Sequence, residues 1–221
     1  MADSLASLLD HSVLKPNATR AEVEAGARLA ATAATASICV QPHAVSWCVD
    51  IVADAPLAIA SVIDFPHGCS PTPVRVAAIS QAIADGATEI DIPVNRSLIR
   101  SDDWSAVSAD CDAITTAAHS GGAKLKLIFE TCELTDAEIV RLCELATAVD
   151  WVKTSTGFGS HGATREAVRL MRQSSPCQVK ASGGIRTRTD AETYRDLGCT
   201  RLGTSGTAAI LGLTGDAATG Y

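Results

Sequence analysis

The sequence predicts a closed (β/α)8 barrel, also called a TIM barrel, with a short N-terminal helical lead-in. Short apolar runs alternate with amphipathic segments along all 221 residues, which is the pattern of parallel strands joined by helical crossovers. Polar residues recur where these runs end, as they do at the active face of such barrels. No G-x-G-x-x-G motif follows the first run, so an open dinucleotide-binding sheet fits less well.

Each predicted strand is short, and most of the helical segments between strands begin at a recognisable capping residue. Thr72 before Pro73 is typical of an N-cap followed by proline at the first helical position, and Gly86 and Gly198 are placed as helix C-terminal glycines. Capping-box spacing occurs in three pairs, Thr19 with Glu22, Thr135 with Glu138 and Thr189 with Glu192. The predicted strands are 8–14, which has the weakest signal, 37–41, 57–65, 89–94, 125–130, 151–154, 178–181 and 201–204.

The composition predicts one globular domain. With 47% hydrophobic and 19% charged residues, the chain falls in the range of folded proteins. The net charge of −7 argues against a nucleic-acid partner, which needs a basic face, and no apolar run is long enough to predict a membrane span. We expect a single barrel domain over residues 1–211 and a mobile tail over 212–221.

The eight cysteines predict a reduced, cytoplasmic protein. They include no C-x-x-C pair and no zinc-like spacing, and the chain starts without a basic, apolar leader. Free thiols in a reducing compartment are the simplest interpretation. The carboxylates also lack metal-ligand spacing, so neither a metal nor another cofactor is predicted.

The predicted chemistry is centred on a lysine at the end of a buried strand. Lys153 ends an apolar run, and a charged amine is costly in an apolar site. A lone lysine of this kind is more often a rim residue that reaches solvent. Lys180 ends the next predicted strand, and two adjacent ammonium groups repel, which can leave one of them as a neutral nucleophile. The alternative is that the two side chains face opposite sides of the sheet.

Asp91 adds a carboxylate to this pair of amines. It shares one face of its predicted strand with Glu89. A carboxylate at the barrel mouth could pair with Lys180 and take a proton from a substrate hydroxyl, directly or through water. A rim carboxylate that only aids solubility is an equally weighted alternative.

Two glycine-rich loops after the last two predicted strands indicate a phosphate site. Gly183 and Gly184 follow one strand, and Gly203 and Ser205 follow the next, before a predicted short helix. Phosphates bind here in (β/α)8 barrels because glycines let backbone N–H groups approach and a helix N-terminus favours an anion.

Other residues carry weaker predictions. Lys126 and Glu130 share one face of their strand and could support the site from behind. Asp10 and Ser12 could lie at the barrel mouth, and Cys39 is expected to be a small core residue near it.

Together these motifs resemble those of the deoxyribose-phosphate aldolase family. The shared stretches follow the family's order through nearly the whole chain. They are 9–16, 62–68, 86–91, 125–132, 152–158, 179–186 and 201–205.

The resemblance implies a metal-free class I aldolase that reversibly cleaves 2-deoxy-D-ribose 5-phosphate to D-glyceraldehyde 3-phosphate and acetaldehyde. Lys153 would then be the Schiff-base lysine, with Asp91 and Lys180 as the proton-relay pair. The expected partners are phosphosugar and aldehyde substrates, and the assembly to consider is a homodimer. Phosphate contacts are expected from Gly157, Phe158, Gly183, Gly184, Gly203 and Ser205.

Some features of the chain leave alternatives open. Asp64 and Pro93 depart from the residues usual in the family and could alter the pocket near Asp91. The terminal Tyr221 could fold over the site, as a tail tyrosine does in some relatives, or belong to a frayed end. The competing functions are another Schiff-base phosphosugar aldolase or transaldolase, and a silent barrel that only binds a phosphosugar.

Overall fold

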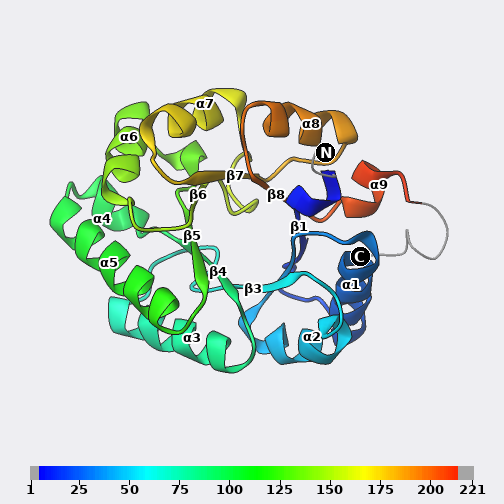
Figure 1. Ribbon diagram of the computed structural model, residues 1–221. Coiled ribbons are helices and arrows are strands. Elements are labelled where there is room, and N and C mark those ends of the chain that lie inside the picture. The colour runs from blue at the N-terminus through cyan, green and yellow to red at the C-terminus, as the bar shows by residue number, and fades with distance from the viewer. Residues whose placement is uncertain (1–4, 214–221) are drawn as a thin grey trace.

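A computed structural model describes residues 5–213, which form a closed barrel of eight parallel strands surrounded by helices (Figure 1). Each strand is hydrogen-bonded to the next along the chain, and the last pairs with the first. This confirms the predicted (β/α)8 fold, and the lead-in is the 3₁₀ helix η1 (Leu5–Leu8). The strands are β1 (Leu9–Val13), β2 (Ser37–Val40), β3 (Ala58–Val62), β4 (Glu89–Pro93), β5 (Lys124–Ile128), β6 (Trp151–Lys153), β7 (Gln178–Ser182) and β8 (Arg201–Thr204).

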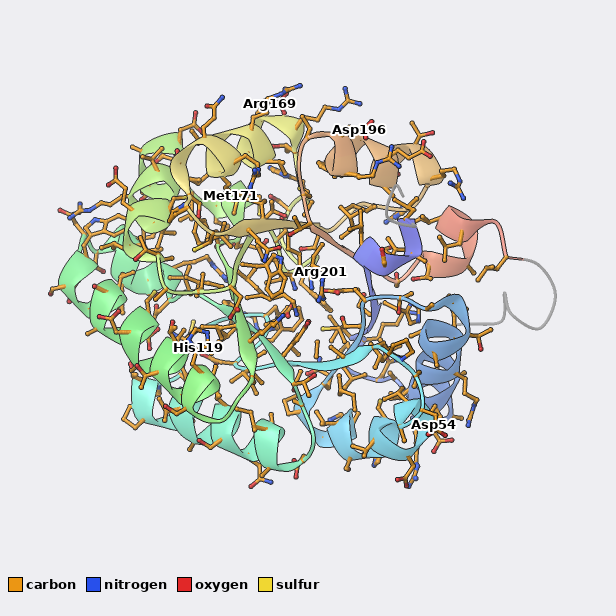
Figure 2. The ribbon with its side chains drawn as sticks, in the orientation of Figure 1. Asp54, His119, Arg169, Met171, Asp196 and Arg201 are labelled. Carbon is orange, nitrogen blue, oxygen red and sulfur yellow. The ribbon has the colours of Figure 1, made fainter. Side chains whose placement is uncertain are left out.

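The main apolar core lies between the barrel and the surrounding helices. Ile38, Ile90 and Leu125 on the strands are fully buried, as is Met171, which lies between its helix and the barrel (Figure 2). None of the helices within 5–213 is long and apolar enough to cross a membrane. The helices are α1 (Arg20–Ala33), α2 (Val45–Val52), α3 (Thr72–Ala84), α4 (Arg96–Arg100), α5 (Trp104–Ser120), α6 (Asp136–Leu145), α7 (Arg165–Ser174), α8 (Arg188–Asp196) and α9 (Thr207–Leu211), with 3₁₀ turns η2 (Pro42–Ala44) and η3 (Thr131–Glu133).

Two of the predicted helix starts are wrong by one or two residues. The capping boxes at Thr19 and Thr135 are present, but α8 is capped by Thr187 rather than Thr189. Asp190 completes this box, because its carboxylate accepts the backbone N–H groups of Arg186 and Thr187.

The start of α3 differs from the prediction in a similar way. Pro71 occupies the N-cap position in place of Thr72. The Thr72 hydroxyl instead donates to Asp110 on α5 at 2.7 Å, so it joins two helices rather than capping one.

The two departures from the family pattern meet at one buried arginine outside the barrel. Asp64 has a left-handed φ of 50° and accepts two hydrogen bonds from Ser70, and its carboxylate lies 3.5 Å from Arg75 Nε. Arg75 also donates to the Pro93 carbonyl at the end of β4. Neither Asp64 nor Pro93 is among the described residues that line the central cavity.

The inside of the barrel is divided into an apolar part and a charged part. Side chains at alternate strand positions point inward. On β2 and β3 these are the small apolar residues Cys39, Ala60 and Val62. The other strands contribute charged side chains, most of them buried. Arg201 is partly buried, and Figure 2 shows it at the centre of the barrel. The cavity opens above this charged part.

Candidate active site

Lys153 projects from the end of β6 into a cavity of about 220 Å³ at the C-terminal ends of the strands. Only 3% of the residue is exposed, and its Nζ donates to Asp91 Oδ2 at 2.7 Å. Burial lowers the pKa of the amine from its ordinary value, the carboxylate of Asp91 opposes this effect, and the charge of Lys180 adds to it. The amine is therefore easier to deprotonate than an exposed lysine.

Lys180 is the direct neighbour of Lys153 in the strand register, and both side chains face the barrel interior. Its Nζ donates to the same Asp91 oxygen at 2.8 Å and also to Asp10. Burial disfavours its charge, but Asp10 and Asp91 outweigh burial and raise the pKa of Lys180. The alternative in which the two lysines face opposite sides is wrong. Their environments shift the two pKa values in opposite directions: that of Lys153 is lowered, and that of Lys180 is raised.

Asp91 is the shared partner of three amines. It is fully buried on β4, where burial disfavours its charge, yet Lys126, Lys153 and Lys180 hold its pKa well below the ordinary value. Lys126 Nζ donates to the second carboxylate oxygen at 2.8 Å. Asp91 thus lies beneath the cavity wall rather than at a solvent-exposed rim, behind the amines of Lys153 and Lys180.

A second layer of charges holds these groups from below. Arg201 on β8 contacts Asp10 Oδ1 at 2.7 Å and Glu89 Oε1 at 2.8 Å, and Lys126 also pairs with Glu89. Sequence reasoning did not assign Arg201 or Glu89 to the site. The available signal was alternation, because Arg201 lies two residues before the predicted site residue Gly203 and so shares its strand face.

The charges inside the barrel come close to balancing, with one positive charge in excess. Four basic groups lie within this network: Lys126, Lys153, Lys180 and Arg201. Three carboxylates face them: Asp10, Glu89 and Asp91. Loss of one proton makes the buried network neutral, which is the less costly state in a medium of low polarity. The direction of its pKa makes Lys153 the group that gives up this proton.

Glycines shape the opposite wall of the cavity. Gly157, Gly183 and Gly184 all have positive φ angles near 80–90°, where side chains are strained. A Cβ on Gly203 would lie 2.8 Å from Ser182 Cβ and 3.2 Å from Lys180 Cε, so this glycine leaves room for the Lys180 side chain. The four glycines and Ser205, which are among the residues expected to contact a phosphate, line the cavity.

Phe158 lines the same wall in a different way from the one expected. Its backbone N–H already donates to Thr156 Oγ1 at 3.0 Å. Its half-exposed ring instead makes an edge contact with Phe65, with 5.4 Å between ring centroids. Phe158 therefore offers an apolar surface to the cavity.

Three more of the predicted residues line the cavity, and so do two basic residues that were not predicted. Asp10, Ser12 and Cys39 line it, and burial raises the pKa of the Cys39 thiol to about 11, so the thiol stays protonated. Lys15 and Arg186, which were not among the predicted site residues, also line it from exposed positions. Both follow strands that carry other site residues. Tyr221 lies outside the described residues.

The chain is similar to known aldolases over nearly all its length. The model of the "DeoC/LacD family aldolase" matches residues 5–209. Deoxyribose-phosphate aldolase from Rhodopirellula baltica is 42% identical over 94% of this chain and 88% of its own length, and deoxyribose-phosphate aldolase 1 from Cutibacterium acnes is 42% identical over 94% and 97%.

Solved structures give the same result. The crystal structure of a putative deoxyribose-phosphate aldolase from Coccidioides immitis is 35% identical with a TM-score of 0.90, covering 94% of this chain and 84% of that one. The tetrameric deoxyribose phosphate aldolase from Aeropyrum pernix is 30% identical with a TM-score of 0.88, covering 94% and 89%.

Proposed function

The chain belongs to the DeoC/LacD family of aldolases, and we propose that it cleaves 2-deoxy-D-ribose 5-phosphate reversibly to D-glyceraldehyde 3-phosphate and acetaldehyde. One observation carries this proposal. The buried amine of Lys153 lines the cavity and shares a carboxylate oxygen with the cation of Lys180. A Schiff-base aldolase needs such an amine in its neutral form.

Lys153 forms the covalent bond in the proposed reaction. Its neutral Nζ attacks C1 of the open-chain aldehyde, and the resulting carbinolamine oxygen takes up a proton and leaves as water. The product is a protonated imine, whose positive charge lies close to the Asp91 carboxylate. This iminium attracts the electrons of the neighbouring C2–C3 bond.

Cleavage then requires proton movement at the C3 hydroxyl. Asp91 accepts this proton through water, the C2–C3 bond breaks, and its electron pair forms an enamine as C3 becomes the aldehyde of glyceraldehyde 3-phosphate. Lys180 keeps Asp91 ionised and moves protons between it and the reacting atoms. Protonation of C2 and hydrolysis of the imine release acetaldehyde and restore the free amine of Lys153.

The substrate phosphate is placed against the glycine wall. The loops at Gly183, Gly184, Gly203 and Ser205 bring backbone groups to the cavity, and the exposed cations Lys15 and Arg186 lie along the same wall. This arrangement suits an anion that is held by backbone donors and neutralised at the rim. No described residue favours the silent-barrel or transaldolase alternatives over this reaction.

Assembly and location are also proposals. We propose a homodimer that acts in the cytoplasm in the breakdown of deoxyribose phosphate, on small-molecule substrates. All eight cysteines are free thiols, which fits a reducing compartment. Light scattering on the purified chain distinguishes a dimer from a monomer and from the tetramer named for the Aeropyrum pernix relative.

The decisive experiment traps the imine. Incubation with acetaldehyde and borohydride should add one ethyl group to the protein, and peptide mass spectrometry should place it on Lys153. Lys153→Ala should lose both the label and the cleavage of 2-deoxy-D-ribose 5-phosphate. Lys124→Ala, which removes an exposed lysine at the other end of a barrel strand, is the matched control. Turnover that persists in Lys153→Ala would overturn the assignment.

A further inference from the structure

A buried carboxylate outside the charged network lies behind the loop that forms one wall of the cavity. Glu130 follows β5 and is 2% exposed. Among the described residues, its hydrogen-bond donors are the backbone N–H and the hydroxyl of Thr156 and, more weakly, the Cys132 thiol. None of these is a cation, so its hydrogen bonds do not depend on an ion pair.

The backbone at Glu130 is itself constrained. Its φ of 58° lies in the left-handed region, which costs free energy for a residue with a side chain. The next residue, Thr131, donates its N–H to the Thr154 carbonyl at 2.9 Å, so the segments after β5 and β6 are joined by a backbone bond as well. The unusual backbone directs the carboxylate beneath the segment after β6.

That segment, residues 156–159, wraps closely around the carboxylate. Thr156 Oγ1 donates to Glu130 and accepts the N–H of Phe158 at 3.0 Å. One hydroxyl therefore connects Glu130 to the backbone two residues further along the chain. A Cβ on Gly159 would lie 2.7 Å from Cys132 Sγ and 3.1 Å from the Glu130 carboxyl carbon, so a side chain there would force these groups to move. Gly157, between the two anchored residues, lines the cavity next to Gly183.

We propose that Glu130 is a positioning residue that fixes the cavity wall at Gly157 through Thr156, and so sets affinity for the substrate phosphate. This inference rests on the proposed function, because it assumes that the phosphate lies against this wall. The carboxylate accepts from two donors of one residue, and charged acceptors form the stronger hydrogen bonds. Loss of the anchor should loosen phosphate binding and leave the chemistry at Lys153 intact.

Glu130→Gln tests the anchor with little change in shape. The amide oxygen can still accept from the Thr156 N–H, but the NH₂ group can only donate, so the bond to Thr156 Oγ1, which already accepts the Phe158 N–H, would have to reverse. We expect KM for 2-deoxy-D-ribose 5-phosphate to rise about tenfold, equivalent to about 1.4 kcal/mol. The rate of acetaldehyde trapping on Lys153, which involves no phosphate, should stay within about twofold of the parent.

Matched variants separate anchoring from general damage. Glu133→Gln removes a half-exposed carboxylate three residues after Glu130, which pairs with Arg96. This change should leave KM unchanged. Thr156→Val should raise KM as Glu130→Gln does, whereas Thr156→Ser keeps the hydroxyl and should keep the parent KM. The double variant Glu130→Gln/Thr156→Val should have a KM no higher than the higher of the two single-variant values, because both changes act through one hydroxyl.

The outcomes distinguish this inference from the proposed function. An unchanged KM in Glu130→Gln, or an equal loss of trapping and of phosphosugar cleavage, overturns the positioning role. Failure of the parent protein to be trapped by acetaldehyde overturns the proposed function instead.

Discussion

At the residue scale, the reactivity of Lys153 depends on a contest between burial and pairing. Burial lowers its pKa, and the Asp91 carboxylate opposes this effect without overcoming it. Lys126 and Lys180 occupy the same carboxylate at 2.8 Å each, so the attraction is shared among three amines. A carboxylate beside a catalytic amine need not hold it in the charged form when other cations saturate that carboxylate.

Lys180→Met should move the pH dependence of imine formation to higher pH. Only neutral Lys153 attacks an aldehyde, so the trapping rate rises as pH increases through its pKa. Removing the Lys180 charge removes a group that lowers this pKa and frees Asp91 to raise it toward 10.5. The trapping rate should therefore fall at neutral pH and recover on the alkaline side, as measured by borohydride trapping across a pH series. Lys180→Arg keeps the charge and should keep the midpoint; a shift equal to that of the methionine variant would contradict this explanation.

At the element scale, the strands were predicted more reliably than the helix starts. All eight predicted strands overlap the observed ones, because apolar runs between polar segments leave few alternatives. The start of α8 was ambiguous because Thr187 and Thr189 each have an acidic residue three positions later. The path of the loop after β7 decides which threonine adopts the extended backbone of an N-cap. That path depends on tertiary packing, so the local sequence does not specify it.

Thr187→Ala should destabilise the protein by about 1 kcal/mol, the usual cost of losing an N-cap. Its side chain accepts the Asp190 N–H, and Asp190 returns the bond to the Thr187 N–H. Thr189→Ala, within the first turn of α8, should change the free energy of unfolding by less than about 0.5 kcal/mol. Urea unfolding of the two variants compares them directly, and equal losses would favour the cap predicted from sequence.

The contact between β1 and α9 should make stability depend on pH. His11 is fully buried on β1, with Nδ1 2.9 Å from Thr207 Oγ1, and burial lowers its pKa to about 4. Between pH 6.5 and 4 the unfolded chain takes up a proton that the folded one refuses, so stability falls by roughly 3 kcal/mol as pH decreases through this range. His11→Asn, which preserves a polar atom near Thr207, should flatten that dependence in urea titrations at the two pH values. The other four histidines are exposed, so an unchanged slope in the variant would refute the assignment.

At the scale of the whole molecule, the sequence suggests candidates for the barrel interior but not their partners across the barrel. Alternation shows which residues of one strand share a face, but the barrel register is what brings Lys153 and Lys180 together on the inside. Arg201 on β8 meets Glu89 on β4 because the strands are staggered around a closed barrel, and no local pattern encodes that contact. The same limit applies to Glu130, whose partner Thr156 is on a different loop.

The buried charge network predicts that the lowered pKa of Lys153, which the proposed reaction needs, reduces the stability of the fold. A lysine whose folded pKa lies below its unfolded value costs stability at neutral pH, and this cost disappears as pH rises toward 10.5. Lys153→Met removes the excess positive charge and leaves three basic groups facing three carboxylates. The free energy of unfolding of this variant should therefore be at least as large as that of the parent at pH 7, with the largest difference at or below neutral pH.

Asp91→Asn should have the opposite effect, because it leaves three buried amines without their shared carboxylate. Breaking a buried ion pair by removing one partner costs about 3 kcal/mol or more. Chemical denaturation of Lys153→Met and Asp91→Asn at pH 7 provides the comparison, with a calorimetric scan to check that each unfolds in one transition. If Lys153→Met proved as unstable as Asp91→Asn, the amine would be a structural cation of the barrel, and its lowered pKa would have to be explained without an excess of positive charge.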